Sequence, residues 1–144
     1  MRIVEISPYL YPHVGGVENH VEELSRHLAA RGHEVTVVTS KHERGLANTE
    51  ERHGYEILRA RTKAILFNTP IAPTMKRILR QLEADIYHVH YPPPLTEYFC
   101  TRALRHKKGG RVLTYHCDVE LPIPLGRLVT VLYSKLVTTY VAHY

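Results

Sequence analysis

The pattern of apolar and polar positions is clearest in residues 1–39. Residues 2–7 form a short apolar run, and residues 34–39 form a β-branched run of the kind found in buried parallel strands. Between these runs, apolar side chains recur at helical spacing on one stripe: Val17, Val21, Leu24 and Leu28. Gly32 follows this stripe where a helix would end. The pattern therefore predicts a strand, a helix and a second strand.

The remaining residues continue this alternation. Strands are expected at 55–59, 85–90 and 111–116, and helices at 72–82, at 95–106 and from 125 towards the C-terminus. The polar segment 41–54 predicts a mobile connection. Strands that alternate with helices of crossover length favour a parallel sheet with right-handed connections. We therefore predict an α/β fold with a Rossmann-like parallel sheet, helices on both faces and a single domain over residues 1–144.

The composition is that of an ordinary globular domain. Of the 144 residues, 44% are apolar and 23% are charged, which allows a sizeable core. Cys100 and Cys117 lack CxxC spacing, so we expect no disulfide framework and a reducing cytoplasm. Met1 leads directly into the first expected strand, without the pattern of a signal peptide. The apolar stretch 121–142 is interrupted by prolines and basic residues and predicts no membrane span.

The chain is basic, with a net charge of +5 and a pI of about 9.3. This balance favours an anionic partner such as a nucleotide or a phospholipid. The basic residues are spread over several segments, with local groups at 76–80 and 105–111. No aromatic residues interleave with them in a stacking pattern, so we expect no nucleic-acid partner. Ordinary solvated basic faces are the alternative explanation.

Two glycines, Gly15 and Gly16, stand directly before the first expected helix. Free backbone N–H groups and the positive end of the helix dipole favour an anion there, although paired glycines also occur in simple turns. The spacing is not that of the dinucleotide fingerprint, which needs G-x-G-x-x-G after the strand and an acidic residue at the end of the second strand. Here the second strand ends in Thr39-Ser40-Lys41, so NAD binding is disfavoured.

Histidines mark the ends of two expected strands. His88 and His90 share one face of a strand, and His90 lies nearer the carboxyl end, where ligands bind in such sheets, whereas His88 is interpreted as structural. His116 ends the next strand and is soon followed by Asp118, so His90, His116 and Asp118 are expected around one pocket. Packed histidines are the alternative. A zinc site built from these three residues lacks a strong metal-ligand spacing, and no metal is expected.

Other polar residues give weaker signals. No serine lies in a G-x-S-x-G elbow, so hydrolase chemistry is not expected. Asn19, His20 and His27 lie on the first expected helix and are interpreted as part of its solvated face.

Three segments resemble one enzyme family. Residues 12–39, which include Gly-Gly-Val-Glu-Asn-His-Val, closely resemble the start of family-four retaining glycosyltransferases with the GT-B architecture. Residues 85–90 resemble the D-x-x-H-x-H strand of that family, and residues 114–118 resemble its T-x-H-x-D segment. In this order the three segments span almost the whole chain.

The resemblance implies two Rossmann-like domains that face each other across a cleft, with the acceptor on the N-terminal domain and the nucleotide sugar on the C-terminal one. This chain resembles the N-terminal, acceptor-side domain. By the same resemblance, His116 is expected near the transferred sugar as a catalytic residue, and His90 is expected to support its pocket. Gly15 and Gly16 are expected near the donor diphosphate or the acceptor, and Asp118 is expected to bind substrate.

The resemblance also implies front-face transfer assisted by the donor phosphate, with no protein nucleophile, cofactor or divalent metal. The C-terminal domain, with its Glu-x7-Glu segment, is absent from residues 1–144, so we expect no transfer by this chain alone. Many related enzymes use lipid-linked acceptors, which adds the hypothesis of peripheral contact with an anionic membrane at its inner face. The alternative is a non-catalytic module that binds a nucleotide or phosphate.

Overall fold

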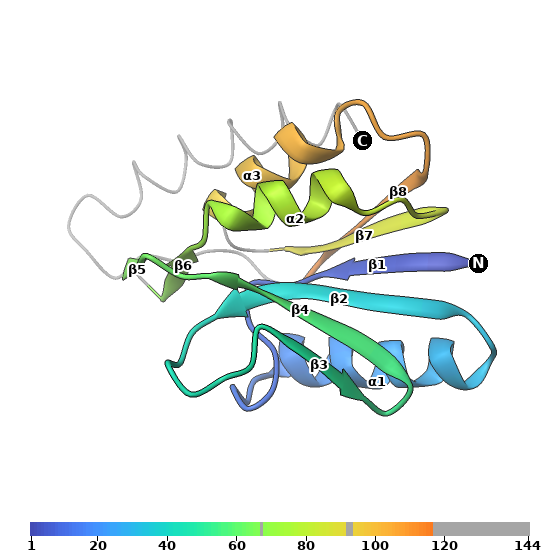
Figure 1. The fold of residues 1–144 in the computed structure, drawn as a ribbon, viewed down its shortest axis with the longest axis horizontal. Coiled ribbons are helices and arrows are strands. Elements are labelled where there is room, and N and C mark those ends of the chain that lie inside the picture. The colour runs from blue at the N-terminus through green and yellow to red at the C-terminus, as the bar shows by residue number, and fades with distance from the viewer. Residues whose placement is uncertain (67, 92–93, 117–144) are drawn as a thin grey trace.

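The fold is a mostly parallel sheet packed between helices (Figure 1). The computed structural model describes residues 1–66, 68–91 and 94–116. The strands are β1 (Arg2–Ile6), β2 (Glu34–Lys41), β3 (Thr49–Arg52), β4 (Tyr55–Arg61), β5 (Ala64–Leu66), β6 (Thr69–Ile71), β7 (Ile86–Tyr91) and β8 (Gly110–Tyr115). The helices are α1 (Gly16–Ala30), α2 (Thr74–Gln81) and α3 (Pro94–Leu104).

The main sheet has the strand order β3-β4-β2-β1-β7-β8, and β5 and β6 pair separately. In the main sheet β4, β2, β1, β7 and β8 run parallel to one another, and β3, at the edge, is antiparallel to β4. Helix α1 covers one face, and α2 and α3 cover the other (Figure 1). The predicted α/β architecture is therefore confirmed. The strand order reverses between β1 and β7, and ligands bind beyond the carboxyl ends of the strands at such a point.

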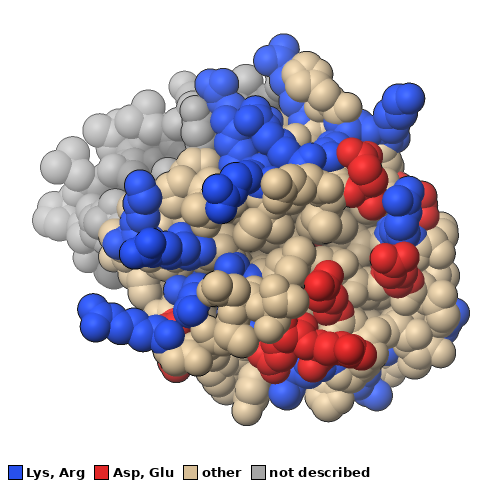
Figure 2. Space-filling model, in the orientation of Figure 1, with Lys and Arg blue, Asp and Glu red and all other residues tan. Residues whose placement is uncertain are grey.

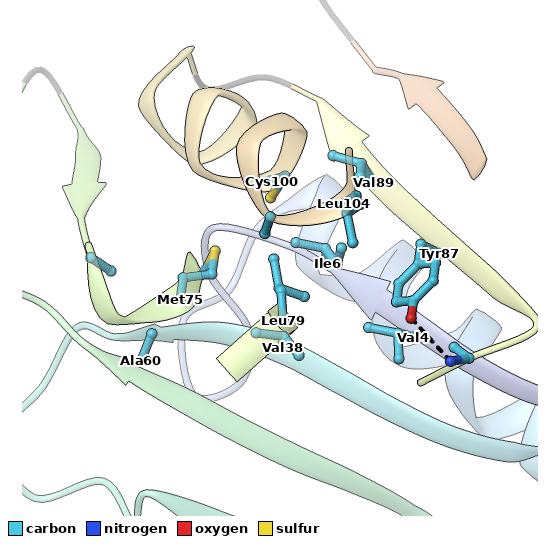
Figure 3. Packing of buried hydrophobic residues seen from close by; sticks show 13 residues of the cluster. Val4, Ile6, Val38, Ala60, Met75, Leu79, Tyr87, Val89, Cys100 and Leu104 are labelled. Carbon is cyan, nitrogen blue, oxygen red and sulfur yellow. Dashed lines mark hydrogen bonds between the residues drawn. The ribbon is translucent and has the colours of Figure 1, made fainter. Parts of the chain in front are cut away.

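The face beneath α2 and α3 holds a large apolar core (Figure 3). Val4 of β1 packs there with Leu79 of α2 and Leu104 of α3, and all three side chains are buried. Tyr87 of β7 is also buried in this core, and its hydroxyl donates a hydrogen bond of 2.9 Å to the carbonyl of Leu82. The one polar atom of this aromatic side chain is thereby satisfied without leaving the core.

The opposite face of the sheet packs against α1. Ile3 of β1, Val35 of β2 and Ile57 of β4 form a second core with Val21 of the helix. Alternate residues of a strand point to opposite faces, so Glu5 lies on the same face as Ile3. A buried carboxylate therefore interrupts the apolar surface beneath α1.

The end of α1 confirms the predicted helix stop at Gly32. Gly32 has a φ of 83°, a left-handed conformation that glycine adopts without steric cost. Its N–H donates to the carbonyl of Ala29 at 2.9 Å, and the N–H of His33 donates to that of Leu28 at 3.2 Å. These two hydrogen bonds form a Schellman motif, which pairs helix carbonyls that would otherwise lack a donor.

Segment 41–54 is only in part the connection that its polar composition predicted: residues 42–48 form a loop, but a strand follows. Thr49–Arg52 forms β3, which pairs with β4 at the edge of the sheet. Edge strands in proteins are often short and charged, because such side chains discourage pairing with another molecule. The composition that predicted a loop is therefore equally suited to an edge strand. The small β5–β6 hairpin was not predicted either.

The other expected strands and helices among the described residues are present within two residues of their predicted bounds. The helix expected from residue 125, and the apolar stretch 121–142, lie outside the described residues. Within the described part of the chain, every helix is too short or too polar to cross a bilayer.

Replacing Leu79 by alanine tests the core beneath α2. Leu79 is fully buried, so Leu79→Ala should leave a cavity and lower the free energy of unfolding by about 2–5 kcal/mol. Urea denaturation measures this difference. Arg80→Ala, at the exposed next position, is the control and should change the free energy by no more than about 0.5 kcal/mol. Equal effects of the two variants would contradict this packing.

Candidate functional site

The candidate site begins with Glu5, a carboxylate in the middle of β1 that is only 1% exposed. The strand register pairs Glu5 with His88 of β7, and pairs His90 with Thr114 of β8. Paired residues of neighbouring parallel strands point to the same face of a sheet. Glu5, His88 and His90 therefore lie together beneath α1, at the point where the strand order reverses.

Both histidines of β7 contact the same carboxylate oxygen. Oε2 of Glu5 lies 2.7 Å from Nε2 of His90 and 3.0 Å from Nδ1 of His88. An ionised carboxylate only accepts hydrogen bonds, so both of these ring nitrogens carry the proton. The other nitrogen of His88, Nε2, forms a hydrogen bond of 2.7 Å with the hydroxyl of Thr114.

The chain of hydrogen bonds continues from His90 to His116. Nδ1 of His90 lies 3.0 Å from Nε2 of His116, and the two rings stack with centroids 5.3 Å apart. Because His90 donates its proton to Glu5, its Nδ1 accepts and Nε2 of His116 donates. Glu5 thus fixes the tautomer of His90, and His90 in turn fixes that of His116. The remaining nitrogen of His116, Nδ1, is an acceptor.

Burial and hydrogen bonding shift the pKa values of the three hydrogen-bonded groups, Glu5, His90 and His116. Burial by itself raises the pKa of Glu5, but the hydrogen bonds from His88 and His90 outweigh it and bring the pKa below its ordinary 4.5. Burial lowers the pKa of His90 below 6.5, and the hydrogen bond to Glu5 only partly opposes this. Burial and the neighbouring histidines also lower the pKa of His116. At neutral pH this hydrogen-bonded series therefore consists of the Glu5 carboxylate and the neutral imidazoles of His90 and His116.

Helix α1 brings a further histidine to the site. The ring of His20 meets the rings of His116 and His90 edge-on, with centroids 5.2 and 5.6 Å apart. His20 is exposed to solvent and lies four residues after Gly16, on the same side of the helix. The first turns of α1 and the carboxyl end of β8 therefore border one site.

The two glycines of the loop differ in their surroundings. At Gly15, a Cβ atom would collide with the carboxylate of Glu18, which folds back over this residue and also lies 3.2 Å from Nδ1 of His13. At Gly16, a Cβ atom would meet none of the described residues within 4 Å. Gly16 is therefore open to an approaching group, whereas a negative charge already lies against Gly15.

A wide basic groove of about 1220 Å³ lies along the carboxyl ends of β2 and β4, between β5 and α2. Among the described residues that line it, Glu43 is the only acidic one, and six are cationic: Lys41, Arg44, Arg59, Arg61, Lys63 and Arg77. Figure 2 shows Lys and Arg side chains along the left and the top of this face, with acidic side chains mainly below and to the right. The groove is suited to a ligand that carries negative charge.

Most of the sequence-predicted site residues lie close together. His90 and His116 are hydrogen-bonded to each other, and Gly16 lies one helical turn from the ring beside them. Asp118 lies outside the described residues. The expected roles of these residues stay predictions, because the geometry alone does not assign a substrate contact.

Two residues of the site were missed. The apolar pattern of residues 2–7 does not single out Glu5, although a lone carboxylate in a buried strand indicates a buried hydrogen-bond partner. His20 was interpreted as part of a solvated face. It is exposed, but its position four residues after Gly16 places it at the site rather than away from it.

The pKa shifts predict how stability depends on pH. Groups whose pKa is lower in the folded chain stabilise it above their unfolded pKa, and this contribution is lost as the pH falls. For His90 and His116 the loss should begin below about 6.5, and for Glu5 below about 4.5. Urea denaturation between about pH 7.5 and 3.5 should therefore show two stages of falling stability, each limited to about 1.4 kcal/mol per pH unit and group.

The variant Glu5→Gln separates the two stages. It keeps the shape of the side chain but removes the carboxylate, so the loss below about pH 4.5 should become smaller than in the unchanged chain. His27→Gln is the control, because His27 is exposed on α1 and contacts Glu23 of its own helix. An unchanged acid dependence in Glu5→Gln would contradict the hydrogen-bonded carboxylate.

Comparison with known proteins places this chain in a family. Residues 14–142 match the family described as Glycosyltransferase Family 4. A GDP-mannose-dependent alpha-mannosyltransferase of Mycolicibacterium smegmatis is 29% identical over 125 residues, which are 83% of this chain and 33% of the relative. Phosphatidyl-myo-inositol mannosyltransferase of Mycobacterium leprae is 28% identical over 137 residues, 88% of this chain and 34% of the relative. The chain thus spans about a third of the length of these relatives.

A solved structure supports the same assignment of the fold. Sucrose-phosphate synthase from Thermosynechococcus elongatus superposes with a TM-score of 0.65 at 17% identity, over 94% of this chain and 39% of that one. At this identity the likeness concerns the fold. Together with the match over residues 14–142, it establishes that the chain belongs to glycosyltransferase family 4 and has the fold of a GT-B N-terminal domain.

Proposed function

We propose that this chain is the N-terminal, acceptor-side half of a glycosyltransferase that moves a sugar from a nucleotide-sugar donor to an acceptor with retention of configuration. A C-terminal nucleotide-sugar domain completes the site. In this proposal residues 1–144 do not transfer sugar by themselves, because the groups that hold the donor belong to that second domain. The family membership and the geometry of His116 support it.

The observation that carries the proposal is the hydrogen-bonded chain from Glu5 through His90 to His116. It holds a neutral imidazole in one tautomer at the carboxyl end of β8. A fixed imidazole of this kind forms hydrogen bonds with sugar hydroxyls without first having to be ordered. We therefore assign His116 the contact with the transferred sugar, and assign Glu5 and His90 the positioning of His116.

The open backbone at Gly16 supports a role beside the donor. No described atom lies within 4 Å of a Cβ placed at Gly16, so a ligand can come close to the backbone there. Helix N-termini favour phosphate groups. In the proposed reaction the acceptor hydroxyl attacks the anomeric carbon on the face that the leaving phosphate departs from. A phosphate oxygen takes up the hydroxyl proton, and the nucleoside diphosphate leaves. No protein nucleophile, cofactor or metal takes part in this scheme.

The basic groove supports an anionic acceptor. Two relatives are named for phosphatidylinositol lipids: the Mycobacterium leprae enzyme and a phosphatidylinositol N-acetylglucosaminyltransferase protein of Arabidopsis thaliana, 25% identical over 114 residues. We propose a lipid-linked acceptor, whose phosphate lies in the groove while the protein rests on the inner face of the membrane. Lys107 is not part of this surface, because its Nζ is engaged by the carbonyls of Arg80 and Leu82 and by Glu83.

The competing function is a binding module without catalysis. It predicts that the 144-residue chain binds a nucleotide sugar tightly by itself, whereas the proposed half-enzyme leaves most donor contacts to the other domain. Equilibrium dialysis with GDP- and UDP-sugars distinguishes the two. Micromolar or tighter binding by this chain alone favours the module.

The transfer reaction gives the main functional test. A protein that continues past Tyr144 into a second α/β domain should transfer sugar from a radiolabelled donor, and residues 1–144 alone should not. In the longer protein, His116→Ala should lower kcat/KM by about 10²–10³-fold, the usual effect of removing one preorganised hydrogen-bonding group. His27→Ala, on the same domain but away from the site, is the matched control.

Two results would overturn the assignment. Transfer by the 144-residue chain alone would refute the division of labour between the domains. Full activity of His116→Ala would refute the sugar contact, even if the enzyme class proved correct.

Vesicle flotation tests the membrane contact. The chain should float with vesicles that contain phosphatidylinositol or phosphatidylserine and should not float with neutral vesicles. The double variant Lys63→Glu with Arg77→Glu should reduce flotation several-fold, because both residues line the groove. Arg26→Glu with Arg31→Glu, on α1 and at its C-terminal end on the opposite face of the sheet, is the charge-matched double control. Equal flotation with both kinds of vesicle would remove the proposal.

A further inference from the structure

Three histidines from three elements converge at the carboxyl edge of the sheet. They are His20 of α1, His90 of β7 and His116 after β8. One ring nitrogen of each lies within 4.8 Å of the others, and the pair from His90 and His116 is 3.0 Å apart. Two imidazole nitrogens on one tetrahedral zinc ion lie roughly 3.3 Å apart, given Zn–N bonds of about 2.0–2.1 Å. The spacing therefore already approaches that of a metal site.

The buried carboxylate adds a second, independent feature. Metal-bound histidines usually donate their other ring N–H to a carboxylate, which fixes the tautomer and aims the free lone pair at the metal. Glu5 does this for His90: it accepts the Nε2 proton at 2.7 Å, and Nδ1 faces His116. Glu5 is 1% exposed and His90 equally so, which makes this half of the site rigid.

We propose that His20, His90 and His116 bind one divalent transition-metal ion, with zinc as the best match, and that a fourth coordination position stays open to solvent. Imidazole ligands suit zinc, copper and nickel better than magnesium or calcium, which prefer oxygen. His20 is the exposed ligand and the one by which the ion enters. The site needs no residue outside the described part of the chain.

Binding requires rearrangement of the two histidines outside the buried interior. The ring of His116 must tilt so that its lone pair and that of His90 converge on the ion rather than point at each other. Nε2 of His116 must give up the proton that it shares with His90, and the same ring takes one up from water at Nδ1, so the imidazole stays neutral and no net proton is released. His20 must turn its ring towards the other two. This motion is open to an exposed side chain on a helix surface.

The neighbouring group of Glu5, His88 and His90 is a poorer candidate. Its ring nitrogens already share the carboxylate oxygen as hydrogen-bond donors, and Thr114 occupies the other nitrogen of His88. An ion there would displace both hydrogen bonds to the buried carboxylate. By contrast, the site at His20 breaks only the hydrogen bond between His90 and His116.

The zinc site overlaps the position where His116 is proposed to contact the sugar. Zinc and the sugar would therefore exclude each other, and this consequence alone rests on the proposed function. Zinc binding itself does not rest on the proposed function. If zinc does not bind, the sugar-transfer proposal can still be tested, and the reverse also holds. Titration of the metal in the absence of donor and acceptor keeps the two apart.

Isothermal titration calorimetry with zinc chloride tests the proposal on the 144-residue chain after treatment with a chelator. We expect one zinc ion per chain. His20→Gln should weaken the affinity at least tenfold by removing a ligand, and Glu5→Gln should weaken it about 10–100-fold by removing the carboxylate behind His90. His27→Gln, at an exposed position of the same helix, should bind zinc like the unchanged chain.

Cobalt provides a spectroscopic check of the same site. Co²⁺ in a tetrahedral site gives strong visible absorption, which should appear with the unchanged chain and His27→Gln and be lost in His20→Gln. The proposal is overturned by an absence of zinc binding, by equal affinity of His20→Gln and the unchanged chain, or by a loss in His27→Gln as large as that in His20→Gln.

Discussion

The pairing of the Glu5 carboxylate with two histidines is the interaction on which the rest of the site depends. A charge buried in an apolar core is strongly unfavourable unless hydrogen bonds replace the water it loses. Here His88 and His90 provide both bonds, from the strand that lies beside β1. The register of β1 and β7 is thereby tied to the chemistry, since a shift by one residue would turn the histidines to the opposite face.

From the buried carboxylate and its histidines, hydrogen bonds fix the orientation of side chains outwards to the solvent. Glu5 orients His90, and His90 orients His116, which is only half-buried at the end of β8. Helix α1 closes the same edge with His20 and with the open backbone at Gly16. The site therefore combines a rigid interior with an exposed rim, the arrangement expected where a ligand is held in one orientation. The basic groove along β2 and β4 adds a positively charged surface at this edge of the sheet.

Much of the fold could be predicted from the spacing of apolar residues. The stripe from Val17 to Leu28 fits only a helix, and the β-branched run after it fits only a strand. The pairing of His90 with His116 followed as well, since the carboxyl ends of neighbouring parallel strands meet. Polar segment 41–54 was different. Its charged residues are equally compatible with a loop and with an edge strand, and pairing with β4 decides between them.

Glu5 and His20 needed three-dimensional information for a similar reason. A carboxylate within a strand indicates that it has a partner, but the partner comes from a strand more than 80 residues later. A histidine on a helix is solvated or engaged according to what lies beside it, and here His20 of α1 meets the histidines at the ends of β7 and β8. Local patterns determine the elements, whereas long-range contacts determine which side chains meet.

The protonation of the histidines is the most direct test of this account. Long-range ¹H–¹⁵N NMR at neutral pH distinguishes the two neutral tautomers from the charged imidazole. The account predicts that His90 carries its proton on Nε2 and His116 carries its proton on Nε2, with both rings neutral. A proton on Nδ1 of His90, or a positively charged His90, would contradict the central role of Glu5.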